Sequence, residues 1–406
     1  MTSDDNHGDG MLNKGMLNGV RILDFTRLLA GPYATRILAD FGAEVIKVQS
    51  KKIAKGAESN IGGYFSTWNR NKRSITLNMD HPEAREIALK LTAISDIVID
   101  NFSPRVMSNW GLGYERLRTV KSDLIMIEMS GMGQTGPWKN FVAFGPTLQA
   151  LGGLTYLTSY DTVSPMGPGY AHADHVAGLY GALAALAALA YRDRTGLGRY
   201  INLSEYEAVC TLIGPALLDV IGNQNNPVPQ GNRPANIPAA PYGCYRCQGK
   251  DRWCVIAVFD DTQWQALCHI IDRPDWAEEE RFSGVVERKG HMEEMDRGIG
   301  QWTSRHKAET VVSLLQGAGI PAGVVQNAQD LANDPQLKAR DFFVPLDHPV
   351  LGKTTGDGSP IKFKKNETRD WKPSPLLGQD NRYVYTTLLG FTDSQLSSYE
   401  KKGIIV

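Results

Sequence analysis

The fold is decided by the N-terminal sequence Val20-Arg-Ile-Leu-Asp-Phe25 and by two segments that follow it, Tyr33–Phe41 and Glu44–Val48. The first and last are short runs rich in β-forming residues, which predict strands. Between them, Gly31-Pro32 precedes Tyr33–Phe41, and proline suits the first turn of a helix. A strand, a helix and a second strand in this order predict a parallel βαβ unit.

The same alternation continues along the chain to about residue 200. We expect strands at Ser74–Met79, Ile97–Asp100 and Asp123–Met129, and a helix at Pro82–Ala93. Short apolar strands that alternate with helices indicate an open parallel sheet covered by helices on both faces. The predicted fold class is therefore α/β, with a Rossmann-like open parallel sheet.

A smaller α+β region is expected further on. Residues 222–241 are rich in proline and asparagine and predict a crossing linker. After it, Tyr242–Cys247 and Trp253–Phe259 predict a hairpin, a helix is expected at Thr262–Ile271, and Pro321–Gln326 predicts a strand that leaves the region.

The composition is that of an ordinary soluble globular protein, with 42% hydrophobic and 21% charged residues in 406. A net charge of −1 predicts no bulk attraction to nucleic acid or to an anionic membrane. The apolar run Val176–Tyr191 is shorter than the roughly 20 residues that a membrane span needs. Met1–Asn18 is polar and lacks the apolar core of a signal peptide, so we expect a cytoplasmic protein.

The five cysteines predict reduced thiols, since nothing in the sequence indicates secretion. Cys244 and Cys247 have CxxC spacing, which raises the alternative of a metal or redox site. A structural zinc site needs a second pair at ligand spacing, and Cys254 and Cys268 lie too far apart in sequence to be that pair. Ordinary cysteines in strands are favoured, and no metal is predicted.

Asp174 is the strongest candidate for chemistry. It precedes the uncharged run Val176–Tyr191, which Arg192-Asp-Arg-Thr-Gly196 closes, and this pattern predicts a buried helix with a glycine stop. Asp174 is expected at or near the N-cap, where backbone N–H groups and the helix dipole keep a carboxylate ionised. The residue pattern leaves two interpretations open, a helix cap and a nucleophile.

The glycine-rich segment Gly131-Met-Gly133-Gln-Thr-Gly136 has the GxGxxG pattern of dinucleotide-binding proteins. That fingerprint opens a helix and is followed by an acid about 20 residues later. Here Pro137-Trp138 follows, and the next acid is Asp161. NAD(P) binding is therefore not predicted, although a glycine-rich loop after a strand is a good place for another ligand.

Nine segments, taken together and in order, resemble one family. The segments are Leu17–Thr26 with Ala30-Gly-Pro32, Leu38–Lys47, Asn69–Arg73, Asn101–Pro104, Ser130–Pro137, Asp174 with its apolar helix, Arg194–Gly198, Pro321-Ala-Gly323 and Asp334-Pro335. They resemble the class III CoA-transferases, of the formyl-CoA and carnitine CoA-transferase type. The resemblance covers roughly residues 17–360.

This resemblance implies an interlocked homodimer, or a close heterodimer with a related subunit. Each active site would lie between the large domain of one chain and the small domain of the other. The implied domains are a tail over 1–18, the N-terminal part of the large domain over 19–205, a linker helix and crossing segment over 206–241, a small α+β domain over 242–325, and a return linker with the C-terminal part of the large domain over 326–406.

The resemblance also identifies Asp174 with the family's nucleophilic aspartate. Its carboxylate would attack an acyl-CoA thioester to give a mixed anhydride, from which CoA thiolate forms an aspartyl-CoA thioester. The implied partners are acyl-CoA and carboxylic acid molecules, with CoA thioesters as substrates and no permanently bound cofactor.

Further site residues follow from the matched motifs. Lys72 and Arg73 would hold CoA phosphate, the alternative being solvated surface charge. Gly133, Gly152 and Gly153 are candidates for an oxyanion site, with plain structural turns as the alternative. The remaining CoA-binding candidates are Leu29, Ala30, Asn101, Phe102, Arg105 and Phe144.

The sequence departs from the family pattern where the acyl group is expected. Leu29 replaces a glutamine of formyl-CoA transferase, Asn109 replaces an arginine, and Gln49-Ser50 replaces an acid and its turn. Arg105 is a candidate to supply the lost charge. Fewer polar groups favour a bulky or aromatic (di)carboxylate, such as a benzylsuccinate-type acid, over formate or oxalate, and succinyl-CoA is the expected donor.

Two rival functions stay open. The first is an acyl-CoA racemase of the same fold, although Asn140–Thr147 contains no histidine where racemases carry Gly-His-Asp. The second is a subunit of a heteromeric transferase without its own activity, which the altered Gln49, Asn109 and Phe144 would suit.

Overall fold

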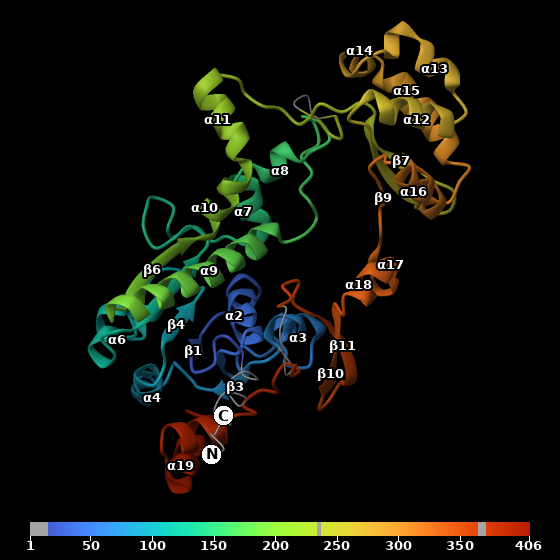
Figure 1. The fold of residues 1–406 in the computed structure, drawn as a ribbon. Helices are drawn as coiled ribbons and strands as arrows, with labels where there is room; N and C mark the ends of the chain where they lie inside the picture. Colours follow the sequence, from blue (N-terminus) through green and yellow to red (C-terminus); the bar gives the residue numbers. More distant parts are fainter. Residues whose placement is uncertain (1–14, 234–236, 364–370) are drawn as a thin grey trace, which may run out of the picture. The chain divides into compact units, whose positions relative to one another are not determined.

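The computed structural model describes residues 15–233, 237–363 and 371–406. The predicted N-terminal tail lies mostly outside them. The chain divides into two compact units (Figure 1). Unit 1 comprises residues 1–155, 167–226 and 338–406, and unit 2 comprises residues 156–166 and 227–337.

Unit 1 is built on a six-stranded parallel sheet, which confirms the predicted fold class. The strand order reverses between β1 and β4, so the chain segments that leave these two strands diverge and open a crevice at their carboxyl ends. In sheet order the strands are β3 (Arg73–Thr76), β2 (Glu44–Gln49), β1 (Arg21–Asp24), β4 (Ile97–Asp100), β5 (Ile125–Ser130) and β6 (Arg199–Ser204).

The five predicted strands and the helix over Pro82–Ala93 are present in unit 1, with ends shifted by a few residues. The helix expected at Tyr33–Phe41 begins earlier, at Ala30. Strand β6 was not predicted, because it lies at the sheet edge and most of its side chains are exposed or half-exposed, so it lacks a continuous apolar signal.

Helices cover both faces of this sheet. On one face, α2 (Ala30–Asp40) and α9 (His172–Thr195) close a core with the strands. The other helices of unit 1 are α3 (Gly63–Asn69), α4 (Pro82–Ala93), α5 (Val106–Asn109), α6 (Tyr114–Val120), α7 (Gly145–Leu151), α10 (Glu205–Cys210), α11 (Gly214–Asn223) and α19 (Asp393–Lys401), with short helical turns η1 (Gly56–Glu58), η2 (Thr211–Ile213) and η4 (Tyr383–Leu388); α8 (Leu154–Leu157) lies at the unit boundary.

The C-terminal segment of the chain also belongs to unit 1. Tyr385 and Ile404 are buried in the core on the α4 face of the sheet. Asp380 accepts a hydrogen bond from the Ser74 backbone N–H at 2.9 Å, which ties the C-terminal segment to β3. The hairpin of β10 (Phe343–His348) and β11 (Gly352–Asp357) belongs to the same unit.

Helix α9 packs closely because its buried face is made of small residues. A Cβ atom at Gly178 would lie 2.8 Å from the Ala30 carbonyl oxygen, and one at Gly181 would lie 2.7 Å from Met129 Sδ. The helix ends at Gly196 in the left-handed conformation, as the sequence predicts. By length and composition α9 could span a membrane, yet 44% of its most apolar window is buried within the protein.

Unit 2 is an α+β unit with an antiparallel sheet of order β7-β8-β9. The predicted hairpin is present as β7 (Tyr242–Arg246) and β8 (Trp253–Ala257), and β9 (Ala322–Val324) pairs with β8. The helices are α12 (Asp261–Ile270), α13 (Pro274–Glu278), α14 (Val285–Gly290), α15 (Met292–Thr303), α16 (Ala308–Gly317) and α17 (Ala328–Asn333), with η3 (Glu280–Phe282); α18 (Pro335–Ala339) lies at the unit boundary.

The cysteines of unit 2 lie in or beside this sheet and its helices. Cys247, Cys254 and Cys268 are buried, and all five thiols of the chain are free. Burial raises the pKa of the Cys244 and Cys247 thiols above the ordinary value, which disfavours the reactive thiolate.

Candidate active site

Asp174 lies in the first turn of α9, three residues after the N-cap. The N-cap is Ala171, so Asp174 lies near the N-cap, as predicted, but is not itself the cap. His172 and Ala173 already have helical backbone, which places Asp174 third in the helix. An acidic side chain there still interacts favourably with the helix dipole.

Burial governs the ionisation of Asp174. It raises the pKa of the carboxyl group above its ordinary value, while a hydrogen bond from the residue's own backbone N–H and the charge of His175 act in the opposite direction. The helix end by itself would lower the pKa, and burial outweighs it. A half-buried carboxylate with a raised pKa is more basic, and therefore a better nucleophile, than one in water.

Gly145 brings the backbone of α7 against this carboxylate. A Cβ atom at Gly145 would overlap Asp174 Oδ2, so a residue with a side chain would displace the carboxylate. From the same helix, Gln149 Oε1 accepts a hydrogen bond from the Ala173 N–H at 3.4 Å. Helix α7 therefore fixes both the first turn of α9 and the space around Asp174.

Aromatic rings surround the histidine next to Asp174. The His175 ring lies 4.9 Å from Tyr170, 5.1 Å from Tyr33 and 5.2 Å from Trp68, measured between ring centroids. Its Nδ1 is 2.7 Å from the Ala171 carbonyl oxygen. These contacts hold the ring in place. On α3, burial and the charge of Asp174 raise the pKa of Tyr64 to about 12.

A second carboxyl group, that of Glu205, lies within electrostatic reach of Asp174. Glu205 is the first residue of α10 and is 7% exposed. Burial and then the charge of Asp174 raise the pKa of Glu205 to about 8. The sequence analysis missed this residue, because a glutamate just after a polar edge strand looks like a surface residue.

At the crevice between β1 and β4, Asn101 joins the loops that follow the two strands. Asn101 Oδ1 accepts from the Arg27 N–H at 2.7 Å, and its Nδ2 donates to the Arg27 carbonyl oxygen at 2.9 Å. The Arg27 guanidinium lies over the Phe102 ring, 5.1 Å from its centroid. Among the described residues, Arg27 Nε is buried without a hydrogen-bond partner. The sequence analysis did not select Arg27.

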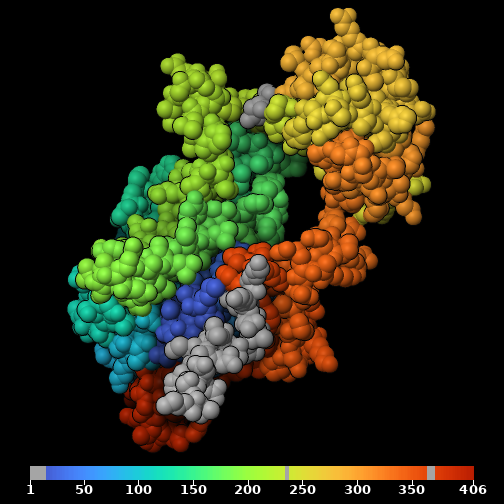
Figure 2. Space-filling model, viewed as in Figure 1, coloured from blue at the N-terminus to red at the C-terminus, as the bar shows by residue number. Residues whose placement is uncertain are grey.

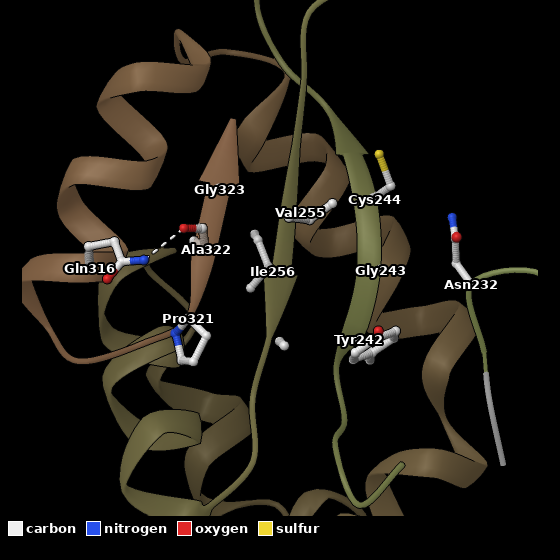
Figure 3. Close-up of a pocket in the computed structure, with 11 residues that line it drawn as sticks. Asn232, Tyr242, Gly243, Cys244, Val255, Ile256, Gln316, Pro321, Ala322 and Gly323 are labelled. Carbon is white, nitrogen blue, oxygen red and sulfur yellow. Dashed lines mark hydrogen bonds between the residues drawn. The ribbon is translucent and has the colours of Figure 1, made fainter. Parts of the chain in front are cut away.

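Unit 2 contains a cavity of about 440 Å³ against its three-stranded sheet (Figure 3). The wall includes Tyr242, Cys244, Val255 and the segment Pro321–Gly323, which is one of the sequence motifs singled out above. Most of these groups are apolar, and a cavity of this size can hold a small organic molecule.

Comparisons with known proteins place this arrangement in a family. The family model described as CoA-transferase family III matches residues 17–381. The chain belongs to CoA-transferase family III. Succinyl-CoA–D-citramalate CoA-transferase of Chloroflexus aurantiacus is 32% identical over 404 residues, covering 96% of this chain and 98% of that protein.

Other relatives agree. Succinyl-CoA:mesaconate CoA-transferase of Haloarcula marismortui is 34% identical, covering 90% of this chain and 94% of that protein. A solved CaiB/BaiF family protein from Brucella suis superposes with a TM-score of 0.84 at 29% identity, covering 92% of this chain and 100% of that chain. The resemblance inferred from the motifs is confirmed, and the chain is a class III CoA-transferase.

Within this CoA-transferase, the predicted phosphate-binding cations are engaged by other residues. Lys72 is buried, and its Nζ lies 3.1 Å from Asp24 Oδ2 and 3.0 Å from the Pro32 carbonyl oxygen. Burial lowers the pKa of Lys72 to about 7. Arg73 pairs with Glu44 and Asp380. These contacts do not support direct phosphate binding by either residue, and solvated surface charge does not describe Lys72.

The other predicted CoA contacts fall into two groups. Leu29 and Ala30 are buried at the start of α2, where Ala30 meets α9. Arg105 is exposed, with its Nη2 3.4 Å from Asn140 Oδ1. Phe144 is also exposed and is the N-cap of α7, next to Gly145. Their roles in CoA binding stay predictions.

The three glycines predicted for an oxyanion site use their N–H groups within the chain. Gly133 donates to the Ser130 carbonyl oxygen, Gly152 to that of Leu148, and Gly153 to that of Ala150, over 2.8–3.3 Å. A Cβ atom at Gly152 would also overlap the Val209 side chain. Both observations favour the structural interpretation of these glycines.

Proposed function

We propose that this CoA-transferase moves CoA from succinyl-CoA to a dicarboxylic acid acceptor, with Asp174 as the nucleophile. The observation that carries the proposal is the close approach of Gly145 to the Asp174 carboxylate, which leaves that group half-buried and positioned without a side chain in front of it. The relatives named above act on succinyl-CoA together with citramalate or mesaconate.

The proposed reaction proceeds through covalent steps on Asp174. Its carboxylate oxygen attacks the thioester carbonyl carbon, the C–S bond breaks, and the CoA thiolate leaves a mixed anhydride. The thiolate then attacks the aspartyl carbonyl, which releases succinate and leaves an aspartyl-CoA thioester. The acceptor carboxylate displaces the thiolate to form a second anhydride. Thiolate attack on the acceptor's carbonyl finally gives the new acyl-CoA and restores Asp174.

The acceptor is proposed to be bulkier and less polar than formate or oxalate. Leu29 is buried and apolar where the family pattern has a glutamine, and Gln49 is engaged with Asn60, its side-chain oxygen accepting from Asn60 Nδ2 at 3.0 Å. A benzylsuccinate-type acid represents the aromatic end of this class, and citramalate and mesaconate represent the small end.

Covalent trapping tests the nucleophile. We expect succinyl-CoA followed by hydroxylamine or borohydride to modify Asp174, as read by peptide mass spectrometry, and a panel of acids to show which one accepts CoA. Asp174→Asn should abolish trapping and lower kcat by at least about 10³-fold. Glu207→Gln, an exposed change on α10, is the matched control. An active enzyme with an unmodified Asp174 would contradict the mechanism.

We also propose that the enzyme is a dimer of this chain. Several apolar side chains of unit 1 are exposed on α9 and α11, the green helices in Figures 1 and 2. They are Leu179, Tyr180, Leu183, Leu186, Leu217, Leu218, Val220 and Ile221. An apolar surface of this kind on a soluble enzyme is typical of a subunit interface. A relative named as a beta subunit, succinyl-CoA–L-malate CoA-transferase of Chloroflexus aurantiacus, keeps a heterodimer as the alternative.

The racemase interpretation finds no support in the contacts. Racemisation needs a base that reaches the α-proton, whereas His175 is packed among aromatic rings and its Nδ1 contacts the Ala171 carbonyl oxygen. Deuterium uptake at the α-carbon of an acyl-CoA without a second acid would support racemisation and contradict transfer. Cytoplasmic location stays a prediction.

A further inference from the structure

Glu205 is a buried acid that the proposed covalent steps do not use. Two hydrogen bonds fix the start of α10: the Tyr206 N–H donates to the Gly131 carbonyl oxygen at 2.9 Å, and the Glu207 N–H donates to Ser204 Oγ at 3.2 Å. The backbone on either side of Glu205 is therefore held in place. Its carboxyl group makes no hydrogen bond or ion pair with any residue in the described part of the chain, although it is only 7% exposed.

The charges around Glu205 offer it no cation at close range. The first turn of α9 contributes His172, Asp174 and His175, and α7 contributes no ionisable residue. On α10 itself, Glu207 is exposed and burial raises the pKa of the Cys210 thiol, which keeps that group neutral. The start of α9 also packs against α10, because Ala173, beside Asp174, and Val209 belong to one buried apolar cluster against which Tyr206, beside Glu205, packs. The dominant charged neighbour of Glu205 is thus the Asp174 carboxylate, which has the same charge sign.

Two carboxyl groups that share a buried environment do not both ionise at neutral pH, because the second negative charge is repelled by the first. Asp174 has the favourable end of α9 and the charge of His175 beside it, and Glu205 has neither. The proton therefore resides on Glu205.

We propose that Glu205 is a positioning residue that stays protonated while Asp174 is ionised, so that the nucleophile's site carries a single negative charge. This inference rests on the proposed function of Asp174. The substrates are themselves anions, since the acceptor is a carboxylate and CoA leaves as a thiolate. A second fixed negative charge beside Asp174 would repel both, so ionisation of Glu205 at high pH is expected to slow transfer.

The pH dependence of kcat/KM tests this role. We expect the wild-type value to fall above about pH 8, by about tenfold per pH unit. Glu205→Gln replaces the neutral acid by a neutral group of the same shape. It should keep activity within about threefold at neutral pH and lose the alkaline decline. Glu207→Gln, on the same helix but exposed, should keep the wild-type profile.

An alkaline decline that is unchanged in Glu205→Gln would overturn the proposal. So would a folded Glu205→Gln protein that is inactive at neutral pH, because activity would then require an acid or a charge at this position. A merely structural role for Glu205 predicts a change in stability without a change in the shape of the pH profile.

A second measurement needs no substrate. Folding raises the pKa of Glu205 from about 4.5 to about 8. Between these two pH values, the Glu205 carboxyl group is protonated in the folded state and ionised in the unfolded state. The free energy of unfolding should therefore decrease as pH rises across that window. Asp174→Asn removes the repelling charge and lowers the pKa of Glu205, so the upper limit of that window should move below about pH 8 in this variant.

The two measurements separate the two proposals. An upper limit of the window that is the same in wild type and Asp174→Asn would overturn the coupling between the two carboxyl groups, whether or not Glu205→Gln folds. Failure to trap Asp174 with any acyl-CoA, combined with the expected unfolding data, would instead contradict the proposed function and leave the coupled pair established.

Discussion

At the scale of single residues, the space around Asp174 depends on the lack of a side chain at Gly145. Gly145 is the first residue of α7, and a Cβ atom on it would overlap Asp174 Oδ2. The carboxylate can keep its position only with glycine here, so a methyl group at residue 145 should act on catalysis more than on folding.

We predict that Gly145→Ala lowers kcat by about 10²-fold, because a nucleophile displaced by about 1 Å misses its reactive geometry. Steady-state kinetics with circular dichroism of the folded protein checks this. Gly290→Ala, outside the proposed dimer surface, is the matched control, since nothing lies within 4 Å of a Cβ atom there. A Gly145→Ala enzyme with wild-type kcat would show that Asp174 adjusts freely or does not react.

Sequence reasoning at this scale found Asp174 but neither Gly145 nor Glu205. Asp174 stands out because it precedes a long uncharged helix, which is a local pattern. Gly145 and Glu205 matter through contacts with a residue about 30 positions away in the chain, and no local pattern reports such contacts. The electrostatics of Asp174 were misjudged for the same reason, since burial depends on the segments packed over the helix end.

At the scale of elements, the order of the parallel strands determines where a ligand can bind. The reversal between β1 and β4 separates the loops that follow them, and Asn101 ties these loops together by its two hydrogen bonds to the Arg27 backbone. The Arg27 guanidinium therefore lies at the crevice where open α/β sheets bind nucleotides.

We predict that Arg27, rather than Lys72, contacts the anionic nucleotide part of CoA. Arg27→Ala should raise KM for succinyl-CoA by about tenfold through the loss of one charge-assisted contact. It should leave KM unchanged for a succinyl-pantetheine thioester, which lacks the nucleotide. Arg85→Ala, an exposed change on α4, is the control. An equal effect on both thioesters would argue against a nucleotide contact.

The elements themselves were largely predictable, because apolar runs and helix stop signals are local. The order of strands β1 to β5 along the chain and the glycine end of α9 were expected. Edge strand β6 was not, since its exposed side chains resemble those of a loop. The close contact of α9 with α2 also depends on Gly178 and Gly181. The sequence does not show why glycine is needed at these positions, because the reason is the packing of the two helices.

At the scale of the whole molecule, the exposed apolar side chains of α9 and α11 call for a partner surface. Leu218 and Ile221 are 70% and 78% exposed, which is unfavourable for large apolar side chains in contact with water. A second copy of this chain is the occupant that we propose, because the family resemblance implies an interlocked dimer.

We predict that light scattering gives a dimeric mass for the wild-type protein. The Ile221→Asp variant should shift toward the monomer, because a buried unpaired carboxylate destabilises an interface by several kcal/mol. Thr119→Asp, on exposed α6, should remain dimeric. A monomeric wild-type enzyme with full activity would exclude the proposed dimer, and dimerisation only with a related subunit would favour the heteromeric alternative.

The sequence by itself determined the α/β class, the family and the position of Asp174 at the beginning of a long apolar helix, although that helix is buried on one face only. These are properties of local patterns and of their order along the chain. The tertiary structure alone decided that Lys72 is an interior ion-pair partner, that Arg27 lies at the crevice, that Gly145 adjoins Asp174, and that Glu205 lies within electrostatic reach of it. Burial and proximity between distant residues set the pKa values and the geometry, and they exist only once the helices and strands have packed.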